Sequence, residues 1–278
     1  MTLFVFTGIV LLSSIGAGLV GALTGLGGGI VVTPVLTLLL GVDIRYAIGA
    51  SLISVIATSS GAAAAYVRDG LSNVRVGIFL EVATTLGAIC GALISGRLPT
   101  GILAMLFGVV LLHSAWQASQ ARVETPSRSH QGRLSKLLQL GGSYRTADGE
   151  VEYAVSHEGT GLSLMYLAGL LSGLLGIGSG ALKVIAMDRV MGLPFKVSTA
   201  TSSFMIGVTA VASAAIYFKR GYILPQMAVP VMMGVLIGSM LGARLLPRLP
   251  VKTLRRIFAI VVALIAVQMI AKGLRGSL

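Results

Sequence analysis

The chain has 278 residues, of which 55% are hydrophobic and 11% are charged, and its mean hydropathy is +0.93. A soluble domain carries about 25% charged residues, so this composition excludes a soluble enzyme, a nucleic-acid-binding domain and a disordered protein. The net charge of +12 arises from basic residues scattered through short loops, without the basic stripe that nucleic acid requires. We therefore expect an all-α polytopic membrane protein with lipid around most of its surface.

Two of the apolar stretches are too short to cross a bilayer, which takes about 20 helical residues. They are 29–41 and 180–192, and each directly follows a cluster of glycines. The prediction is therefore eight to ten hydrophobic segments, depending on how the glycine-broken helices are counted. The first stretch has no basic residues before it, so we expect a membrane span there rather than a cleaved signal. The remaining stretches, each close to spanning length, are 3–25, 46–66, 76–96, 100–118, 162–177, 197–218, 223–246 and 253–271.

The two halves of the chain are related in sequence. A shift of 151 residues aligns 17–117 with 168–268 without a gap and gives 25 identities in 101 pairs. The matches include Gly29 with Gly180 and Ser51 with Ser202, and the triplet at 97–99 recurs at 248–250. Shared apolar bias does not keep glycines and such a triplet in register. We expect two homologous repeats, as in many secondary transporters.

These observations divide the chain into a first transmembrane repeat at 1–118, a polar loop at 119–161 and a second repeat at 162–278. Within the loop, Val151, Tyr153 and Val155 alternate after Asp148-Gly149, which predicts a small β-hairpin with a turn at that dipeptide. The loop shows no catalytic or metal-binding spacing, and His130 and His157 are isolated in it.

The basic residues favour one orientation in the membrane. With five segments in each half, fourteen basic residues fall on the side of the 119–161 loop and six on the other side. If each glycine-broken pair is instead counted as one span, the basic residues divide eleven to nine and indicate no orientation. The larger excess therefore favours five segments in each half, with this loop in the cytoplasm and both termini outside. An odd number of segments per half makes the repeats inverted relative to each other.

The glycine clusters are the first candidate site. A helix that begins at membrane depth exposes backbone N–H groups and a positive dipole end, which suit an anion. The alternative is close helix packing through small residues. The candidate residues in these clusters are Gly27, Gly28, Gly29, Gly178, Ser179 and Gly180.

Hydroxyl side chains follow both clusters and could donate to an anion without burying a charge. Ser51 and Thr58 lie on one helical face of the first half, and Thr201 and Ser202 follow the second cluster. The alternative for any one of them is a local hydrogen bond to a backbone carbonyl in the preceding turn.

The sequence around these residues resembles the TauE/SafE family of sulfite exporters and toluene-sulfonate permeases. The resemblance rests on 25–29 with Pro34, on 47–52, on 176–183 and on 198–203, and it covers the chain outside 119–161. Two departures are Ser179, where the fuller motif has glycine, and Ile185, which matches Pro34. The resemblance implies a multi-pass transporter in the bacterial inner membrane for small sulfur-containing or organic anions such as sulfite or sulfonates.

Two ionisable residues lie inside apolar segments, where such residues are costly and usually functional. Lys183 follows the second glycine cluster, and it either contacts an anion or snorkels to the interface. Glu81 either carries a coupling proton or pairs with Arg75 or another helix. The matched residues, Val32 and Met232, are uncharged.

Two rival classes were weighed. An intramembrane enzyme lacks support, because no metal or nucleophile motif is present and Ser179 has no GxSxG context. A structural or assembly protein would not need buried charges and matched helix breaks. We expect no enzyme activity, cofactor or metal. The expected partners are a small anion, lipid and, as a coupling ion, the proton, with homo-oligomerisation left open.

Overall fold

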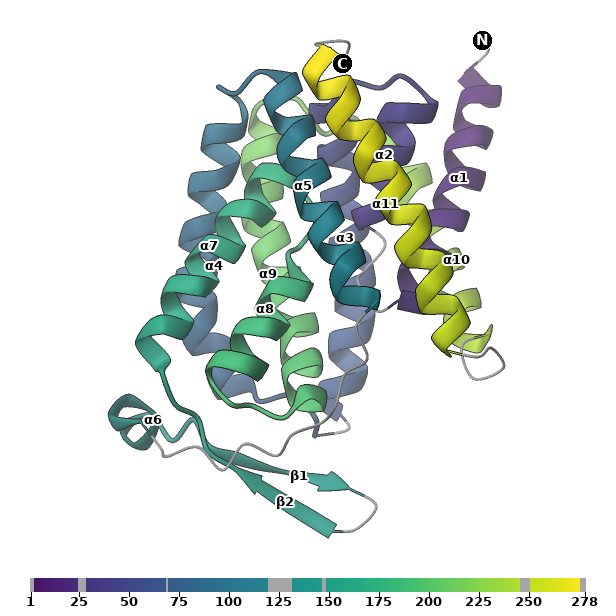
Figure 1. Ribbon diagram of the computed structural model, residues 1–278. Coiled ribbons are helices and arrows are strands. Elements are labelled where there is room, and N and C mark those ends of the chain that lie inside the picture. The colour runs from purple at the N-terminus through teal and green to yellow at the C-terminus, as the bar shows by residue number, and fades with distance from the viewer. Residues whose placement is uncertain are drawn as a thin grey trace.

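The computed structural model describes residues 3–24, 29–68, 70–119, 132–146, 149–245 and 251–275. Its long helices form a bundle, with a two-stranded hairpin at one end (Figure 1). The first turn of α1 and the last turn of α11 lie at the other end. The first-half helices are α1 (Leu3–Thr24), α2 (Gly29–Pro34), α3 (Ile44–Arg68), α4 (Val74–Ser95) and α5 (Thr100–Ser119). The second-half helices are α7 (Glu158–Leu175), α8 (Gly180–Ile185), α9 (Phe195–Lys219), α10 (Pro225–Leu245) and α11 (Val251–Arg275).

The bounds of the elements repeat along the chain. α2, α3 and the start of α4 lie 151 residues before α8, α9 and the start of α10. Each short helix is continued by one π-helical turn, η1 (Val35–Leu39) after α2 and η2 (Ala186–Val190) after α8, again 151 residues apart. Sequence reasoning did not predict these π-helical turns, which in other proteins occur often at functional sites.

Helices from opposite halves pack closely through glycine. α1 packs on α10 and α7 packs on α4, while α5 packs on α11 and α3 on α9. A Cβ atom on Gly169 or Gly173 of α7 would collide with backbone carbonyls of α4, and one on Gly238 would collide with the Ile15 carbonyl of α1. These contacts bring backbones together as small residues do in membrane helix bundles.

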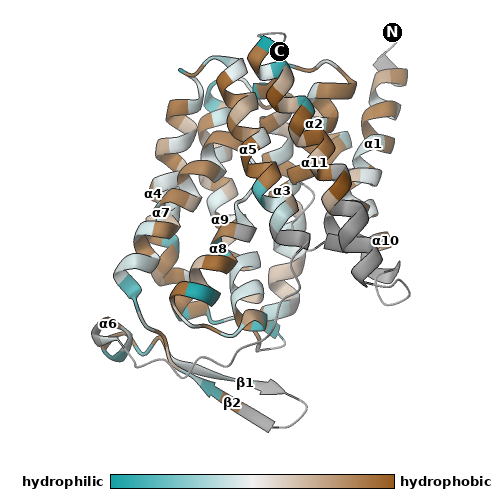
Figure 2. Ribbon diagram, viewed as in Figure 1, coloured by the Kyte–Doolittle hydropathy of each residue, from teal (hydrophilic) through white to brown (hydrophobic). Residues whose placement is uncertain are grey.

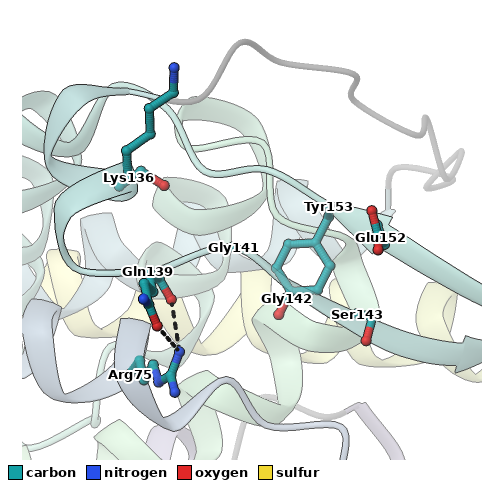
Figure 3. Close-up of a pocket in the computed structure, with 9 residues that line it drawn as sticks. Arg75, Lys136, Gln139, Gly141, Gly142, Ser143, Glu152 and Tyr153 are labelled. Carbon is teal, nitrogen blue, oxygen red and sulfur yellow. Dashed lines mark hydrogen bonds between the residues drawn. The ribbon is translucent and has the colours of Figure 1, made fainter.

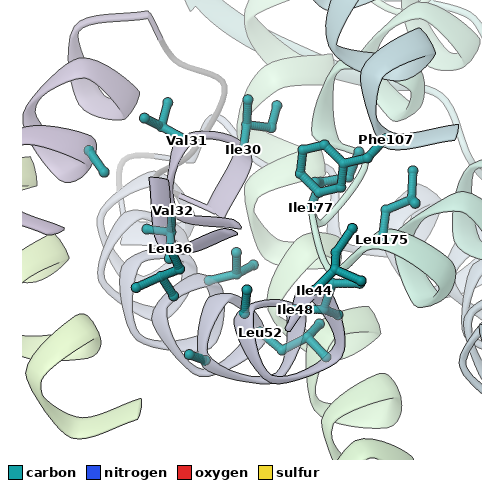
Figure 4. Close-up of a cluster of buried hydrophobic side chains, with 14 of the residues drawn as sticks. Ile30, Val31, Val32, Leu36, Ile44, Ile48, Leu52, Phe107, Leu175 and Ile177 are labelled. Carbon is teal, nitrogen blue, oxygen red and sulfur yellow. The ribbon is translucent and has the colours of Figure 1, made fainter. Parts of the chain in front are cut away.

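The bundle has apolar side chains both inside and outside. Its core includes Ile30 and Leu36 beside Ile48 of α3 and Phe107 of α5 (Figure 4). Other large apolar side chains on α4, α5, α9 and α11 are exposed, and Figure 2 shows long apolar stretches on these helices. Among the described helices, α3, α4, α7 and α9 are long and apolar enough to span a bilayer. These properties are those of a multi-pass membrane protein.

The polar segment between the halves contains a short helix and a hairpin. α6 (Arg133–Leu137) was not predicted, and α7 begins at Glu158, four residues before the predicted start of the second repeat. Strands β1 (Gly142–Thr146) and β2 (Gly149–Tyr153) are antiparallel. Gly149 was predicted to lie in the turn, but it is the first residue of β2 and pairs with Thr146, so its predicted position was wrong. Val155 lies beyond β2 and is buried. His130 lies outside the described residues.

Candidate functional site

The starts of the two short helices meet at one serine of α3. The hydroxyl of Ser51 lies 3.0 Å from the carbonyl oxygen of Gly29, the first residue of α2. It lies equally far from the carbonyl oxygen of Gly176, which ends α7. One hydroxyl proton is shared between the two acceptors. Ser51 therefore joins the helix break of the second half to the start of the short helix in the first.

The backbone around this serine leaves little room for side chains. A Cβ atom on Gly29 would lie 2.9 Å from the Ser51 hydroxyl oxygen and also collide with Val55. Gly178 has φ +71°, a conformation that glycine adopts without strain, and a Cβ atom there would lie 2.8 Å from Ile206. The glycines here thus serve both the backbone turn and close packing. Gly27 and Gly28 lie outside the described residues.

The second half repeats part of this arrangement. Ser202 of α9 donates to the carbonyl oxygen of Gly180 across 3.5 Å, which matches the bond from Ser51 to Gly29. Thr58 donates to the carbonyl of Ser54 one turn earlier, 2.9 Å away, which is the local role weighed for a hydroxyl in the sequence. Thr201 lies apart from the breaks, because its hydroxyl accepts a 2.9 Å bond from the backbone N–H of Asn73.

Ser179, which precedes α8, has a buried hydroxyl with no hydrogen-bond partner among the described residues. Its φ of +47° is unusual for a residue with a side chain. Ser172 of α7 and Thr33 of α2 also have buried hydroxyls without a partner in the described part of the chain. Buried hydroxyls are normally paired, so these groups have hydrogen-bonding capacity for a polar ligand or water.

Lys183 and Glu81 face each other in the interior. Lys183 is fully buried in α8, so it does not snorkel to the interface. Its ammonium nitrogen lies 3.9 Å from one carboxylate oxygen of Glu81, on α4. It also donates to the hydroxyl of Thr209, on α9, across 2.6 Å, and that hydroxyl lies 2.6 Å from the other Glu81 oxygen. Arg75, the other partner weighed for Glu81, instead contacts Gln139.

The sequence was compared with known proteins. Residues 10–269 match the family model for the sulfite exporter TauE/SafE. The chain belongs to the TauE/SafE family. It is 30% identical over 267 residues to the probable membrane transporter protein YunE of Bacillus subtilis, covering 93% of this chain and 95% of the relative. It is 26% identical to the probable membrane transporter protein YdhB of the same organism, covering 85% and 90%.

A more distant relative is the probable membrane transporter protein MJ0441 of Methanocaldococcus jannaschii, 22% identical over 253 residues, covering 86% of this chain and 85% of the relative. No solved structure gives a significant match.

This TauE/SafE chain also has a surface pocket at the hairpin end of the bundle, with a volume of about 480 Å³ (Figure 3). Arg75 of α4, Gln139 and Tyr153 are among the residues that line it. Burial raises the pKa of the Tyr153 phenol, whose oxygen accepts a 2.9 Å bond from the amide of Asn73. None of the residues predicted to bind substrate lines this pocket.

Sequence reasoning missed three residues that hold the helices around the breaks. Thr209 matches Thr58 across the 151-residue offset, but its pairing with Lys183 and Glu81 depends on three helices. Tyr217 is fully buried, and its hydroxyl donates to Ser95 of α4 across 2.7 Å. Its match with Tyr66 in the other repeat was one signal, and its spacing of four residues from Gly221, which also resembles the TauE/SafE family, was another. Asn73, which caps α4 and holds the hairpin, gave no signal beyond its position before an apolar run.

Proposed function

We propose that this TauE/SafE protein is a secondary transporter that moves a small sulfur-containing or organic anion, such as sulfite or a sulfonate, across the bacterial cytoplasmic membrane. The observation that carries the proposal is the contact of Ser51 with both Gly29 and Gly176. It joins two interrupted helices from the two halves of the chain. Paired interrupted helices are the usual setting of a transporter's binding site.

The proposed architecture is two homologous repeats of opposite orientation. The 25 identities and the constant offset of 151 residues between element bounds support the duplication. The exchange of partners, α1 on α10 and α7 on α4, is that expected of a two-fold relation between repeats. The hairpin end is assigned to the cytoplasm because the basic residues are in excess there.

The proposed substrate site lies at the starts of α2 and α8. The N–H groups of a helix's first turn have no acceptor within the helix and favour negative charge. Ser51 and Ser202 hold these starts on α3 and α9, and the free Ser179 hydroxyl adds a neutral donor. The fuller proposed set is Gly27, Gly28, Gly29, Ser51, Thr58, Gly178, Ser179, Gly180, Lys183, Thr201 and Ser202.

Within this set, Thr58 and Thr201 have the weakest support. The hydroxyl of Thr58 is used by a backbone carbonyl, and that of Thr201 accepts from Asn73. Lys183 is the one cation of the set, and Glu81 is the proposed proton-coupling residue. Transport requires no enzyme activity, cofactor or metal, and the described residues contain no cluster of three metal-binding side chains.

The test is flux in proteoliposomes that contain the purified protein. Sulfite, sulfoacetate and toluenesulfonate are offered one at a time, and uptake is compared with liposomes without protein. The proposal expects saturable uptake of at least one of these anions. Any other of the three that binds the same site should inhibit that uptake. Uptake no faster than in empty liposomes for all three would contradict it.

A further inference from the structure

The Lys183–Glu81 pair has two features that packing alone does not explain. A buried ion pair is seldom more stable than apolar side chains of similar size, because both charges lose their water. At the positions related by the 151-residue offset, the chain has Val32 and Met232 in place of Lys183 and Glu81, so the matched arrangement is built without these charges. There α3 packs with α2 and α10 as α9 packs with α8 and α4. The fold therefore does not require the pair.

The pair is also incompletely bonded. Nζ of Lys183 has three N–H donors, and the Thr209 hydroxyl is its hydrogen-bond partner among the described residues. At 3.9 Å, the Glu81 oxygen Oε2 is too far for a hydrogen bond, and it has no other partner in the described part of the chain. The ammonium therefore retains donors for a second anionic group, and the carboxylate has an oxygen that can take a proton.

Thr209 allows both protonation states of Glu81. Its hydroxyl lies 2.6 Å from Oε1 of Glu81 and 2.8 Å from the carbonyl oxygen of Met205. The single hydroxyl proton can therefore go to either acceptor. When Glu81 is charged, Thr209 donates to it. When Glu81 is protonated on Oε1, Thr209 can donate to Met205 and accept from the carboxylic acid. The hydroxyl of Thr85, 3.0 Å from the same oxygen, can keep its contact in both states.

Lys183 lies beside the proposed substrate site. It is three residues after Gly180, whose carbonyl oxygen accepts from Ser202. Ser202 and Thr209 are seven residues apart on α9, so they share one face of that helix. The lysine side chain thus connects the start of α8 with the carboxylate of α4.

We propose that Glu81 is an exchangeable counter-ion: its protonation frees the Lys183 ammonium to pair with the transported anion, so that one proton crosses with each monovalent anion, such as hydrogensulfite or a sulfonate. This inference rests on the function proposed above. The empty site holds one positive and one negative charge. The loaded site holds the ammonium, one monovalent anion and a neutral carboxylic acid, so the net charge is zero in both states. Transport is therefore electroneutral, and its direction follows the combined gradients of anion and proton.

No other charge is placed to replace Glu81 in this exchange among the described residues of the surrounding helices. On α4 the other charged residue is Arg75, and on α7 and α9 the charges lie in the terminal turns, at Glu158, Lys196 and Lys219. α8 contains Lys183 alone, while Asp188 and Arg189 lie on η2. The other titratable groups on these helices are Cys90, Tyr166 and Tyr217, and they form no contact with Glu81 among those described.

The test uses proteoliposomes of the full chain with sulfite outside and a pH-sensitive dye inside. The wild-type protein should acidify the lumen as sulfite enters, and a potassium-clamped membrane potential should not change the initial rate. Sulfite uptake by the wild-type protein without acidification, or at a rate that depends on the potential, would overturn the proposal. This outcome does not depend on any variant. If the protein transports none of the test anions, that result contradicts the proposed function itself and not the role of Glu81.

Glu81→Gln separates coupling from binding. The amide has the shape of the protonated acid but cannot release a proton, so we expect sulfite-for-sulfite exchange to continue while acidification is lost. The matched control is Met232→Gln, which puts the same side chain at the related position of the second repeat and should leave acidification unchanged. Acidification that persists in Glu81→Gln would contradict the proposal, as would loss of exchange in a variant that elutes as folded protein.

Discussion

The hydroxyl of Ser51, in the first half of the chain, lies 3.0 Å from the carbonyl oxygen of Gly176, in the second half. The same hydroxyl lies 3.0 Å from the carbonyl of Gly29. Since all these atoms are buried, Ser51 helps to hold together both helix breaks of the proposed site. Any movement of α2 relative to α7 during transport must change these contacts.

Replacing Ser51 with Ala should lower both stability and anion flux. Two buried carbonyls lose a donor, which costs about 1–3 kcal/mol. The check is the thermal midpoint in detergent, together with sulfite flux in proteoliposomes. Ser60→Ala is the matched control, since Ser60 is exposed and its hydroxyl donates to the carbonyl of Ile56 on the same helix. Equal flux and midpoints for the two variants would remove Ser51 from the site.

Replacing Gly178 with Ala should impair transport more than the same change at Gly70. Both glycines have positive φ, +71° and +67°, so both variants carry backbone strain of about 1–2 kcal/mol. Only at Gly178 does the added carbon meet neighbours, at Ile206 and Val55. Gly178→Val should abolish flux, and Gly27→Val should do the same if the first cluster acts alike. Flux measured at equal protein amounts tests this, and normal flux in the Gly178 variants would exclude the glycine site.

Replacing Lys183 with Met should weaken anion binding at least about tenfold, or about 1.4 kcal/mol. Because the structure places Glu81 opposite, the single change also leaves a buried carboxylate unpaired, at a cost of about 3–5 kcal/mol to stability. The double variant Lys183→Met with Glu81→Gln should recover stability but not binding. Lys183→Arg should retain part of the function, since the charge remains.

The measurements for Lys183 are the thermal midpoint and the sulfite concentration for half-maximal flux. A double variant as unstable as the single one would contradict the pairing with Glu81. Parental affinity in either Met variant would show that Lys183 does not bind the anion, and the site would then be sought among the hydroxyls.

The proposed orientation predicts opposite accessibility for the two ends of the bundle. Ser143, in the hairpin, and Lys219, at the end of α9, are both exposed. In a Cys90→Ala background, Lys219→Cys should react with a membrane-impermeant maleimide in intact spheroplasts, and Ser143→Cys only after lysis. Labelling of Ser143→Cys before lysis, with Lys219→Cys protected, would reverse the assigned orientation.

The positions of the helix breaks could be predicted from the sequence because glycines mark them. α2 and α8 begin at Gly29 and Gly180, where the two short apolar stretches begin. Ser51 was a candidate because it matches Ser202 across the repeats, and the structure places it beside both breaks. Successive helical residues point about 100° apart, so Thr201 and Ser202 cannot both face the break. The sequence alone does not show which of the two does. In the structure, Ser202 faces Gly180, whereas Thr201 faces Asn73.

The contacts between distant segments could not be predicted. Glu81 and Lys183 were each recognised as costly buried charges, but their pairing depends on how α4 and α8 pack around α9. The alternative partner, Arg75, is on the same helix as Glu81 but lies at the hairpin end, where it contacts Gln139. Pro34 directly precedes η1, but Ile185 stands at the matched position before η2, so no one residue type marks both π-helical turns.

The central claim is that this TauE/SafE protein carries a small sulfur-containing or organic anion through the region where α2 and α8 begin. The most direct measurement is the initial rate of sulfite uptake by proteoliposomes that contain wild-type protein, Gly178→Val or Gly70→Ala. The account predicts saturable uptake for the wild type and Gly70→Ala, and uptake at the level of empty liposomes for Gly178→Val. Equal rates for folded wild-type and Gly178→Val protein would contradict it.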